Sequence, residues 1–166
     1  SYRVKLLDGN TWKGMRVFSI QQPSSRDYLN EWLVHKWYEK EGVLTNRYGF
    51  LSLMQNGKRK GNYSFEEHFT HELLTASGMT ETPILKFEEE GVWIQNELRI
   101  KGDTAAQFLP VFYASQVGTF EESKVFGDPE SRAHFVRGHE LLRSFQFGTG
   151  LPDALDLDAW ARYFAI

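Results

Sequence analysis

Short apolar or alternating stretches separated by turn residues predict most of the strands in this chain. The clearest are residues 2–7, 15–21, 48–54 and 60–65, with a shorter extended piece at 82–87. Asn56-Gly57 separates two of these stretches and suits a two-residue type I′ turn, because both positions tolerate a positive φ. The pattern therefore predicts a small antiparallel sheet that contains a hairpin.

A helical period appears first between the second strand and the hairpin. Apolar residues recur there at helical spacing, namely Tyr28, Leu29, Trp32, Leu33 and Trp37. Ser24 and Asp27 form a capping-box-like start, and Gly42 supplies an end. We expect a helix at about 25–41, and further helices at 66–76, from Asp128-Pro129 to about 147, and from Asp156 or Asp158 onward.

The long helix and the hairpin should each bury an apolar face, which gives a predicted core. Its members are Trp32, Leu33, Trp37, Phe50, Leu53 and Tyr63. The segment 91–127 is ambiguous: 92–94 could be a strand, and 104–115 is partly apolar and interrupted by Pro110.

Composition narrows the function classes. The 166 residues carry a net charge of −3, which argues against general nucleic-acid binding. There is no cysteine, so thiolate metal sites and disulfides are excluded, and no apolar run is long enough to predict a membrane span. The chain starts inside a predicted strand and stops on an apolar run at Ile166, so we expect a fragment.

Three polar clusters are candidates for chemistry, and each has an ordinary structural explanation. His68 and His71 lie three residues apart on a predicted helix, but they miss the zincin spacing, so we expect no metal there. The basic run 58–60 is either a charged turn that protects an edge strand or a contact for phosphate or an acidic partner. The acidic run 88–90 is interpreted as a solvated loop. No P-loop or dinucleotide-binding fingerprint is present.

Several segments resemble the CotH-type spore-coat protein kinase family, an atypical kinase-like family. They are RVFSIQQP at 16–23, RDYLNEWL at 26–33, LMQNGKRKGNYSFEEH at 53–68, PILKFEE at 83–89 and LDLDAWARYF at 155–164. The hairpin followed by Glu66-Glu67 is the most specific of them. The resemblance covers most of the chain in order.

The resemblance implies an α+β fold with a kinase-like N-lobe, in which a small antiparallel sheet and one long helix precede a mostly helical region. The expected division is a sheet-plus-helix lobe at 1–100 and the mainly helical start of a second lobe at 101–166, truncated at Ile166. The strand at 15–21 would match the lysine-bearing strand of a kinase, and the helix at 25–41 its regulatory helix. The hairpin would lead to the nucleotide hinge at 65–67.

Family membership would imply ATP and Mg²⁺ as cofactors and serine or threonine of a protein as the phosphate acceptor. The nucleotide-binding residues implied by the resemblance are Lys13, Arg16, Glu31, Glu66, Glu67 and Lys86. Arg16 stands where relatives often have lysine, so Lys13 and Lys86 are alternative phosphate cations, and Glu31 would orient whichever cation is used. The catalytic carboxylates would lie beyond Ile166, and the last two acids, Asp156 and Asp158, would cap the final helix.

A competing hypothesis belongs to another class: a non-catalytic binding or assembly module, or pseudokinase, of a spore-coat or cell-surface protein. An extracytoplasmic setting is implied by the resemblance alone. A metal enzyme built on His68 and His71 is a third hypothesis.

Overall fold

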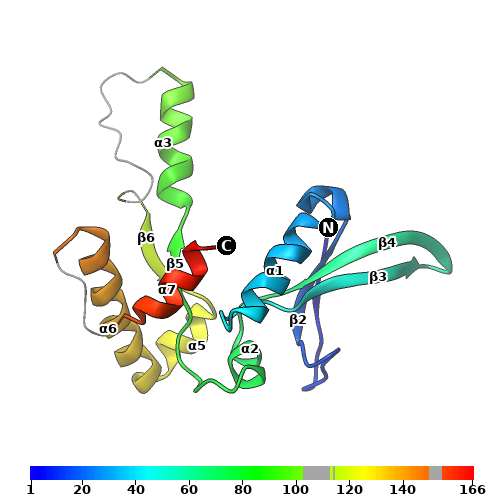
Figure 1. Ribbon diagram of the computed structural model, residues 1–166, viewed down its shortest axis with the longest axis horizontal. Coiled ribbons are helices and arrows are strands. Elements are labelled where there is room, and N and C mark those ends of the chain that lie inside the picture. The colour runs from blue at the N-terminus through cyan, green and yellow to red at the C-terminus, as the bar shows by residue number, and fades with distance from the viewer. Residues whose placement is uncertain (103–112, 114, 150–154) are drawn as a thin grey trace. The chain divides into compact units, whose positions relative to one another are not determined.

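The computed structural model describes residues 1–102, 113, 115–149 and 155–166, and the chain forms two compact units. Unit 1 combines residues 1–81 with 156–166, and unit 2 comprises residues 82–155. The sequence predicted a division at residue 100 instead. Both units contain helices and antiparallel strands, so the α+β class is confirmed (Figure 1).

Unit 1 is built on a four-stranded antiparallel sheet. Its strands are β1 (Tyr2–Lys5), β2 (Val17–Gln21), β3 (Tyr48–Gln55) and β4 (Lys58–Glu67), in the spatial order β1-β2-β4-β3. Asn56 and Gly57 join β3 to β4 with φ angles of 51° and 73°, which confirms the predicted hairpin turn. The register shifts between Leu53 and Met54, where β4 carries one extra residue, Lys60, which indicates a bulge in β4.

The long helix begins later than predicted. A 3₁₀ turn, η1 (Pro23–Arg26), precedes α1 (Asn30–Lys40), and Asp27 and Tyr28 between them have left-handed φ angles of 48° and 55°. The predicted capping box at Ser24 was wrong, because two consecutive left-handed residues end the first turn before α1 starts.

The next helix also starts later than predicted. Strand β4 continues through Glu66 and Glu67, which pair with β2 opposite Ser19 and Phe18, and helix α2 spans only His71–Ala76. The last helix, α7 (Leu157–Phe164), belongs to unit 1. Asp156 caps it by accepting from the Ala159 N–H at 2.8 Å, as predicted for this acid.

The apolar core lies on one face of the unit 1 sheet. Met15, Phe18, Ile20 and Phe65 form its buried centre. Trp12 packs on Phe18 and Phe65, with ring centroids 5.2 Å and 4.9 Å apart. Partly buried side chains surround this centre, namely Val4, Leu6, Trp12, Leu51, Leu53 and Tyr63.

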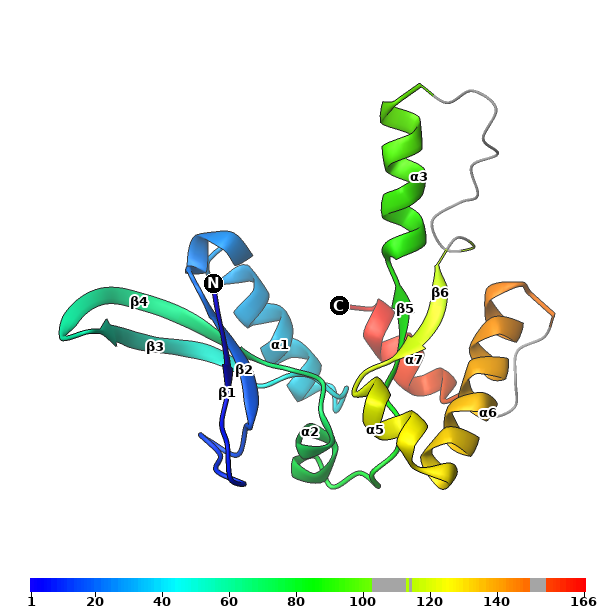
Figure 2. The ribbon, with the colours of Figure 1, turned by 180° about the vertical axis from the view of Figure 1, so that it is seen from behind.

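The predicted core was wrong for Leu33, Trp37 and Phe50, because α1 presents its apolar side to solvent, whereas Leu53 and Tyr63 do pack against the core. Leu33, Trp37 and Phe50 are exposed, and Trp32, Leu53 and Tyr63 are only partly buried. On α1 the outward residues are Leu29, Leu33 and Trp37, of which Trp37 is 51% exposed. The opposite side carries Glu31 and His35, and the His35 ring stacks on Tyr48 of β3. Figure 2 shows α1 alongside the sheet from the opposite side.

In the part of unit 2 that the structure describes, a two-stranded antiparallel sheet is accompanied by helices. The strands are β5 (Leu85–Glu88) and β6 (Gln116–Thr119), and the helices are α3 (Glu90–Ile100), α5 (Glu122–Gly127) and α6 (Pro129–Gln146). Residues 92–94 lie within α3, so a strand there was wrong. The acidic run 88–90 joins the end of β5 to the start of α3 and does not form a loop.

Local signals predicted the start of α6 correctly. Asp128 accepts a hydrogen bond from the Ser131 N–H at 2.7 Å, and Pro129 occupies the first helical position. Most of the segment 104–115, whose pattern was ambiguous, lies outside the described residues. Among the described helices, none has both the length and the apolar character needed to span a membrane.

Candidate functional site

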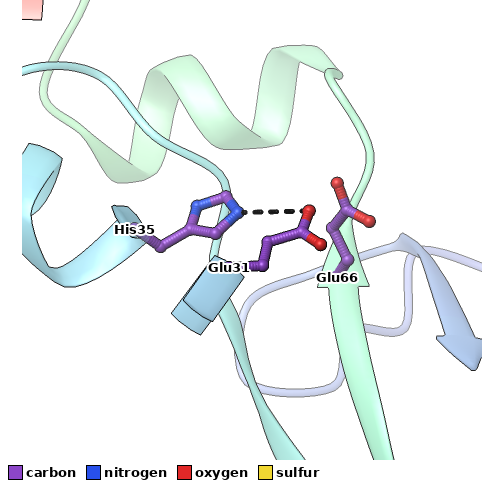
Figure 3. Close-up of side chains that lie close together, drawn as sticks. All are labelled: Glu31, His35 and Glu66. Atoms are coloured by element: carbon purple, nitrogen blue, oxygen red, sulfur yellow. Dashed lines mark ion pairs between the residues drawn. The ribbon is translucent and has the colours of Figure 1, made fainter. Parts of the chain in front are cut away.

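The structure brings together two predicted site residues that are far apart in the sequence. Glu31 lies in the first turn of α1, and Glu66 lies near the end of β4. Both carboxylates are partly buried, with side-chain exposures of 22% and 19%. Figure 3 shows them beside one another, together with His35 of α1.

A guanidinium holds the two carboxylates together. Arg26, in η1, places its terminal nitrogens 3.3 Å from Glu31 Oε1 and 3.0 Å from Glu66 Oε2. Gln21 Nε2, at the end of β2, donates to the same Glu66 oxygen at 3.2 Å. The late start of α1 positions this network, because the 3₁₀ turn carries Arg26 back over the sheet before the helix begins. We call Gln21, Arg26, Glu31 and Glu66 the arginine network.

His35 borders the arginine network in a neutral state. Its Nε2 lies 4.0 Å from Glu31 Oε1, the contact dashed in Figure 3, and its Nδ1 is 2.5 Å from Thr45 Oγ1. Its ring stacks on Tyr48 with centroids 5.1 Å apart. Burial lowers the pKa of His35 below its ordinary value and outweighs the nearby Glu66 charge.

Opposing effects act on the pKa of Glu31 in the arginine network. Burial raises the pKa of Glu31, the Arg26 charge opposes that change, and the Glu66 charge adds to it. Two carboxylates and an imidazole offer ligand atoms within 4.8 Å of one another. Since Arg26 already pairs with both carboxylates, the positive charge that this site requires comes from the protein itself.

Glu67, the neighbouring predicted site residue, has a structural environment. Its carboxylate is 1% exposed and accepts from Arg47 Nε at 2.7 Å and from Arg47 NH2 at 2.5 Å. The same guanidinium donates to the backbone oxygens of Lys13 and Gly14 at 2.7 Å and 3.1 Å. This contact fixes the start of β3 to the end of β4. It indicates a structural role for Glu67 and not a role in ligand binding.

The three predicted phosphate cations lie in three different environments. Lys13 lines a pocket of about 510 Å³ in unit 1, whose lining also includes His35, Arg47 and Phe65. Arg16 Nε pairs with Glu72 of α2 at 2.7 Å. Lys86 belongs to unit 2, where it pairs with Glu88 at 2.9 Å and lies over the Phe120 ring. None of these pairs involves Glu31.

Arg26 is the site residue that sequence reasoning missed. It lies within the stretch 26–33 that carries the family resemblance, which was the one available signal. Residues 58–60 are exposed at the hairpin turn, in agreement with the charged-turn interpretation.

His68 and His71 do not share a helix face. His68 follows the end of β4 and lies 2.7 Å from Ser19 Oγ, whereas His71 starts α2 and lies 3.2 Å from Glu72 Oε1. The predicted helix that would have aligned them does not form.

Comparison with known proteins adds no relative to this description. No family model matches the chain, and no curated protein and no solved structure matches it either.

Proposed function

We propose that this chain is the nucleotide-binding portion of a CotH-like atypical protein kinase, which transfers phosphate from ATP to serine or threonine of a protein. The observation that carries the proposal is Arg26, held between Glu31 of the long helix and Glu66 at the end of β4. Protein kinases orient the cation that meets the phosphates with a glutamate from a helix beside the sheet. Arg26 and Glu31 form a comparable pair here, although Arg26 comes from a 3₁₀ turn and not from a strand.

The element order of unit 1 supports the proposal. Along the chain, two strands, a helix and a hairpin follow one another as the family resemblance implied, with the helix after β2 and before β3. Arg26 replaces Lys13, Arg16 and Lys86 as the preferred phosphate cation. A guanidinium suits this role, because its planar donors match phosphate oxygens in pairs.

The pocket lined by Lys13 and Phe65 is a suitable place for the rest of the nucleotide. Its volume of about 510 Å³ lies within the usual range for small-molecule sites, about 300–1,000 Å³. His35 lines this pocket and also borders the arginine network, so the two features are adjacent. In the proposal the base lies in the pocket and the phosphates approach Arg26.

Mg²⁺ fits the arginine network poorly. Magnesium requires near-octahedral oxygen ligands, and the two carboxylates here are already engaged by Arg26 and Gln21. The proposal therefore leaves the metal-holding carboxylates outside residues 1–166, and we expect no transfer of phosphate from ATP to a protein hydroxyl by this chain alone.

The test is a titration of the chain with ATP, followed by ¹⁵N-resolved NMR. We expect weak, saturable shifts at residues 65–68, at Lys13 and at the Arg26 side chain. The variant R26M should weaken binding about tenfold or more, since a charge-assisted contact to phosphate is worth roughly 1.5–3 kcal/mol. The matched control R59M removes an exposed arginine at the hairpin turn and should bind ATP as the parent does. Equal loss in both variants, or no shift at millimolar ATP, would contradict the proposal.

One observation favours the alternative, a non-catalytic binding or assembly module. Leu29, Leu33 and Trp37 form an exposed apolar stripe along α1, and such a stripe is more typical of a protein-binding surface than of an enzyme exterior. The same titration separates the two functions. A folded chain that shows no response to ATP, while R26M remains equally folded, would favour the module.

A further inference from the structure

A serine of β2 and a histidine that directly follows β4 meet on the sheet face opposite the core. Ser19 Oγ lies 2.7 Å from His68 Nε2. Ser19 is in β2, directly across from Glu66 of β4, and His68 follows two residues later on the same side. The His68 N–H donates to the Val17 carbonyl at 3.0 Å, so the backbone also fixes the histidine beside β2.

This pair has the geometry of a nucleophile and its general base. A serine hydroxyl is a weak nucleophile by itself, and a neutral imidazole within about 2.6–3.2 Å can remove its proton as it attacks. Burial lowers the pKa of His68 below its ordinary value, the positive charge of Arg3 lowers it further, and the negative charge of Glu66 opposes the change. The net shift of the pKa is downward, which favours the neutral imidazole at neutral pH.

Arg3 supplies a third component. It lies on β1 directly across from Ser19, on the side away from Glu66. Directly opposed residues of an antiparallel pair lie side by side on one face, so Arg3 and Ser19 are neighbours. A guanidinium there can stabilise negative charge that develops on an electrophile attacked by Ser19.

The pair is accessible and lies beside the arginine network, because Glu66 is directly across from Ser19. Ser19 and His68 are both partly buried, so each retains contact with solvent. Neither bonds to Arg26, Glu31 or Glu66 in the contacts that define the network.

We propose that Ser19 and His68 form a reactive nucleophile–base pair that takes a phosphoryl group from an activated phosphate or phosphonate ester. Ser19 Oγ forms a bond to phosphorus, and the bond from phosphorus to the leaving group breaks. The Ser19 proton passes to His68 Nε2 and then leaves with the departing group. Arg3 faces the phosphoryl oxygens. This proposal does not depend on ATP binding.

The test uses a fluorophosphonate probe, in which fluoride is the leaving group, with the adduct located by intact-mass and peptide mass spectrometry. We expect one adduct, at Ser19. The variant S19A should abolish it, whereas S52A, which removes an exposed serine from β3, should leave it unchanged. The labelling rate should rise with pH through the depressed pKa of His68 and level off at neutral pH.

The variant H68Q separates a chemical role from a structural one. Glutamine can still hydrogen-bond to Ser19 but cannot take its proton, so labelling should slow by about 100-fold or more. Thermal melts of S19A and H68Q confirm that each variant folds. No adduct at Ser19 in the folded parent, equal labelling of Ser52, or an unchanged rate in H68Q would each overturn the proposal.

Discussion

Glu67 and Arg47 form a two-contact ion pair in which the carboxylate is almost completely buried. Arg47 reaches it from the segment before β3, and the same guanidinium binds the backbone oxygens of Lys13 and Gly14. One side chain thus joins the loop before β2, the start of β3 and the end of β4. Stability of unit 1 should depend strongly on this contact.

Removal of the guanidinium should destabilise unit 1 severely. R47M keeps an apolar stem but leaves the Glu67 carboxylate buried without its partner, which costs about 3–5 kcal/mol. Urea unfolding followed by tryptophan fluorescence measures the change. The control K36M breaks an exposed pair with Glu39 and should cost no more than about 1 kcal/mol. Similar losses in both variants would show that Arg47 has no special role.

Two glycines test how tightly Arg47 is held. Gly9 and Gly14 both have positive φ, 73° and 79°, so alanine is strained at each. A Cβ at Gly9 meets nothing within 4 Å, whereas a Cβ at Gly14 would lie 2.4 Å from Arg47 NH1. Because four oxygens, two of Glu67 and the backbone oxygens of Lys13 and Gly14, fix that guanidinium, G14A should cost about 1–2 kcal/mol more than G9A. Equal unfolding midpoints for G9A and G14A would mean that Arg47 moves aside without loss.

Two methionines test where the core lies. Met15 is completely buried in the centre of the core, and Met54 is 68% exposed opposite the bulge in β4. M15A should therefore cost about 2–5 kcal/mol, and M54A should change stability by about 0.5 kcal/mol or less. Denaturant unfolding measures the loss of stability in both variants. A larger loss in M54A than in M15A would contradict a core centred on Met15.

Acid should weaken unit 1 before its carboxylates titrate. Burial lowers the pKa values of His35 and His68 in the folded chain, so the unfolded chain binds more protons just below the ordinary value of 6.5. The contribution of the two histidines to stability is therefore fully present above pH 6.5. It is lost as the pH falls through the pKa values of these histidines in the folded chain. The double variant H35Q/H68Q should flatten this dependence in thermal melts between about pH 5 and 7.5. The control H134Q, at an exposed position on α6, should keep it.

Local signals in the sequence were sufficient where the structure is determined locally. The Asn56-Gly57 turn and the Asp128-Pro129 helix start depend on backbone conformation and one hydrogen bond, and both formed as predicted. The start of α1 could not be predicted in this way. Left-handed conformations at Asp27 and Tyr28 are set by the contacts of η1 with the sheet.

Periodicity predicts that a helix has an apolar side, but it does not say which side of the helix faces the sheet. The core and the site both depend on that orientation. The apolar stripe of α1 predicted burial, but Glu31 and His35 face the sheet and Trp37 faces solvent. Glu31 and Glu66 were named from the sequence, yet their shared cation was not, because Arg26 becomes a neighbour of Glu66 only after the 3₁₀ turn folds back.

The return of the chain to unit 1 affects the order in which this protein can be assembled during translation. The four strands lie before residue 68, whereas α7 follows the whole of unit 2. The Tyr163 ring of α7 stacks on Tyr38 of α1, with centroids 5.2 Å apart and planes 6° from parallel. The ribosome therefore releases the sheet long before this stacking partner exists. Unit 2 is then the loop that connects two parts of unit 1, and the entropic cost of closing a loop grows only slowly with its length. An insertion within unit 2 should therefore destabilise the protein less than an insertion between β2 and α1.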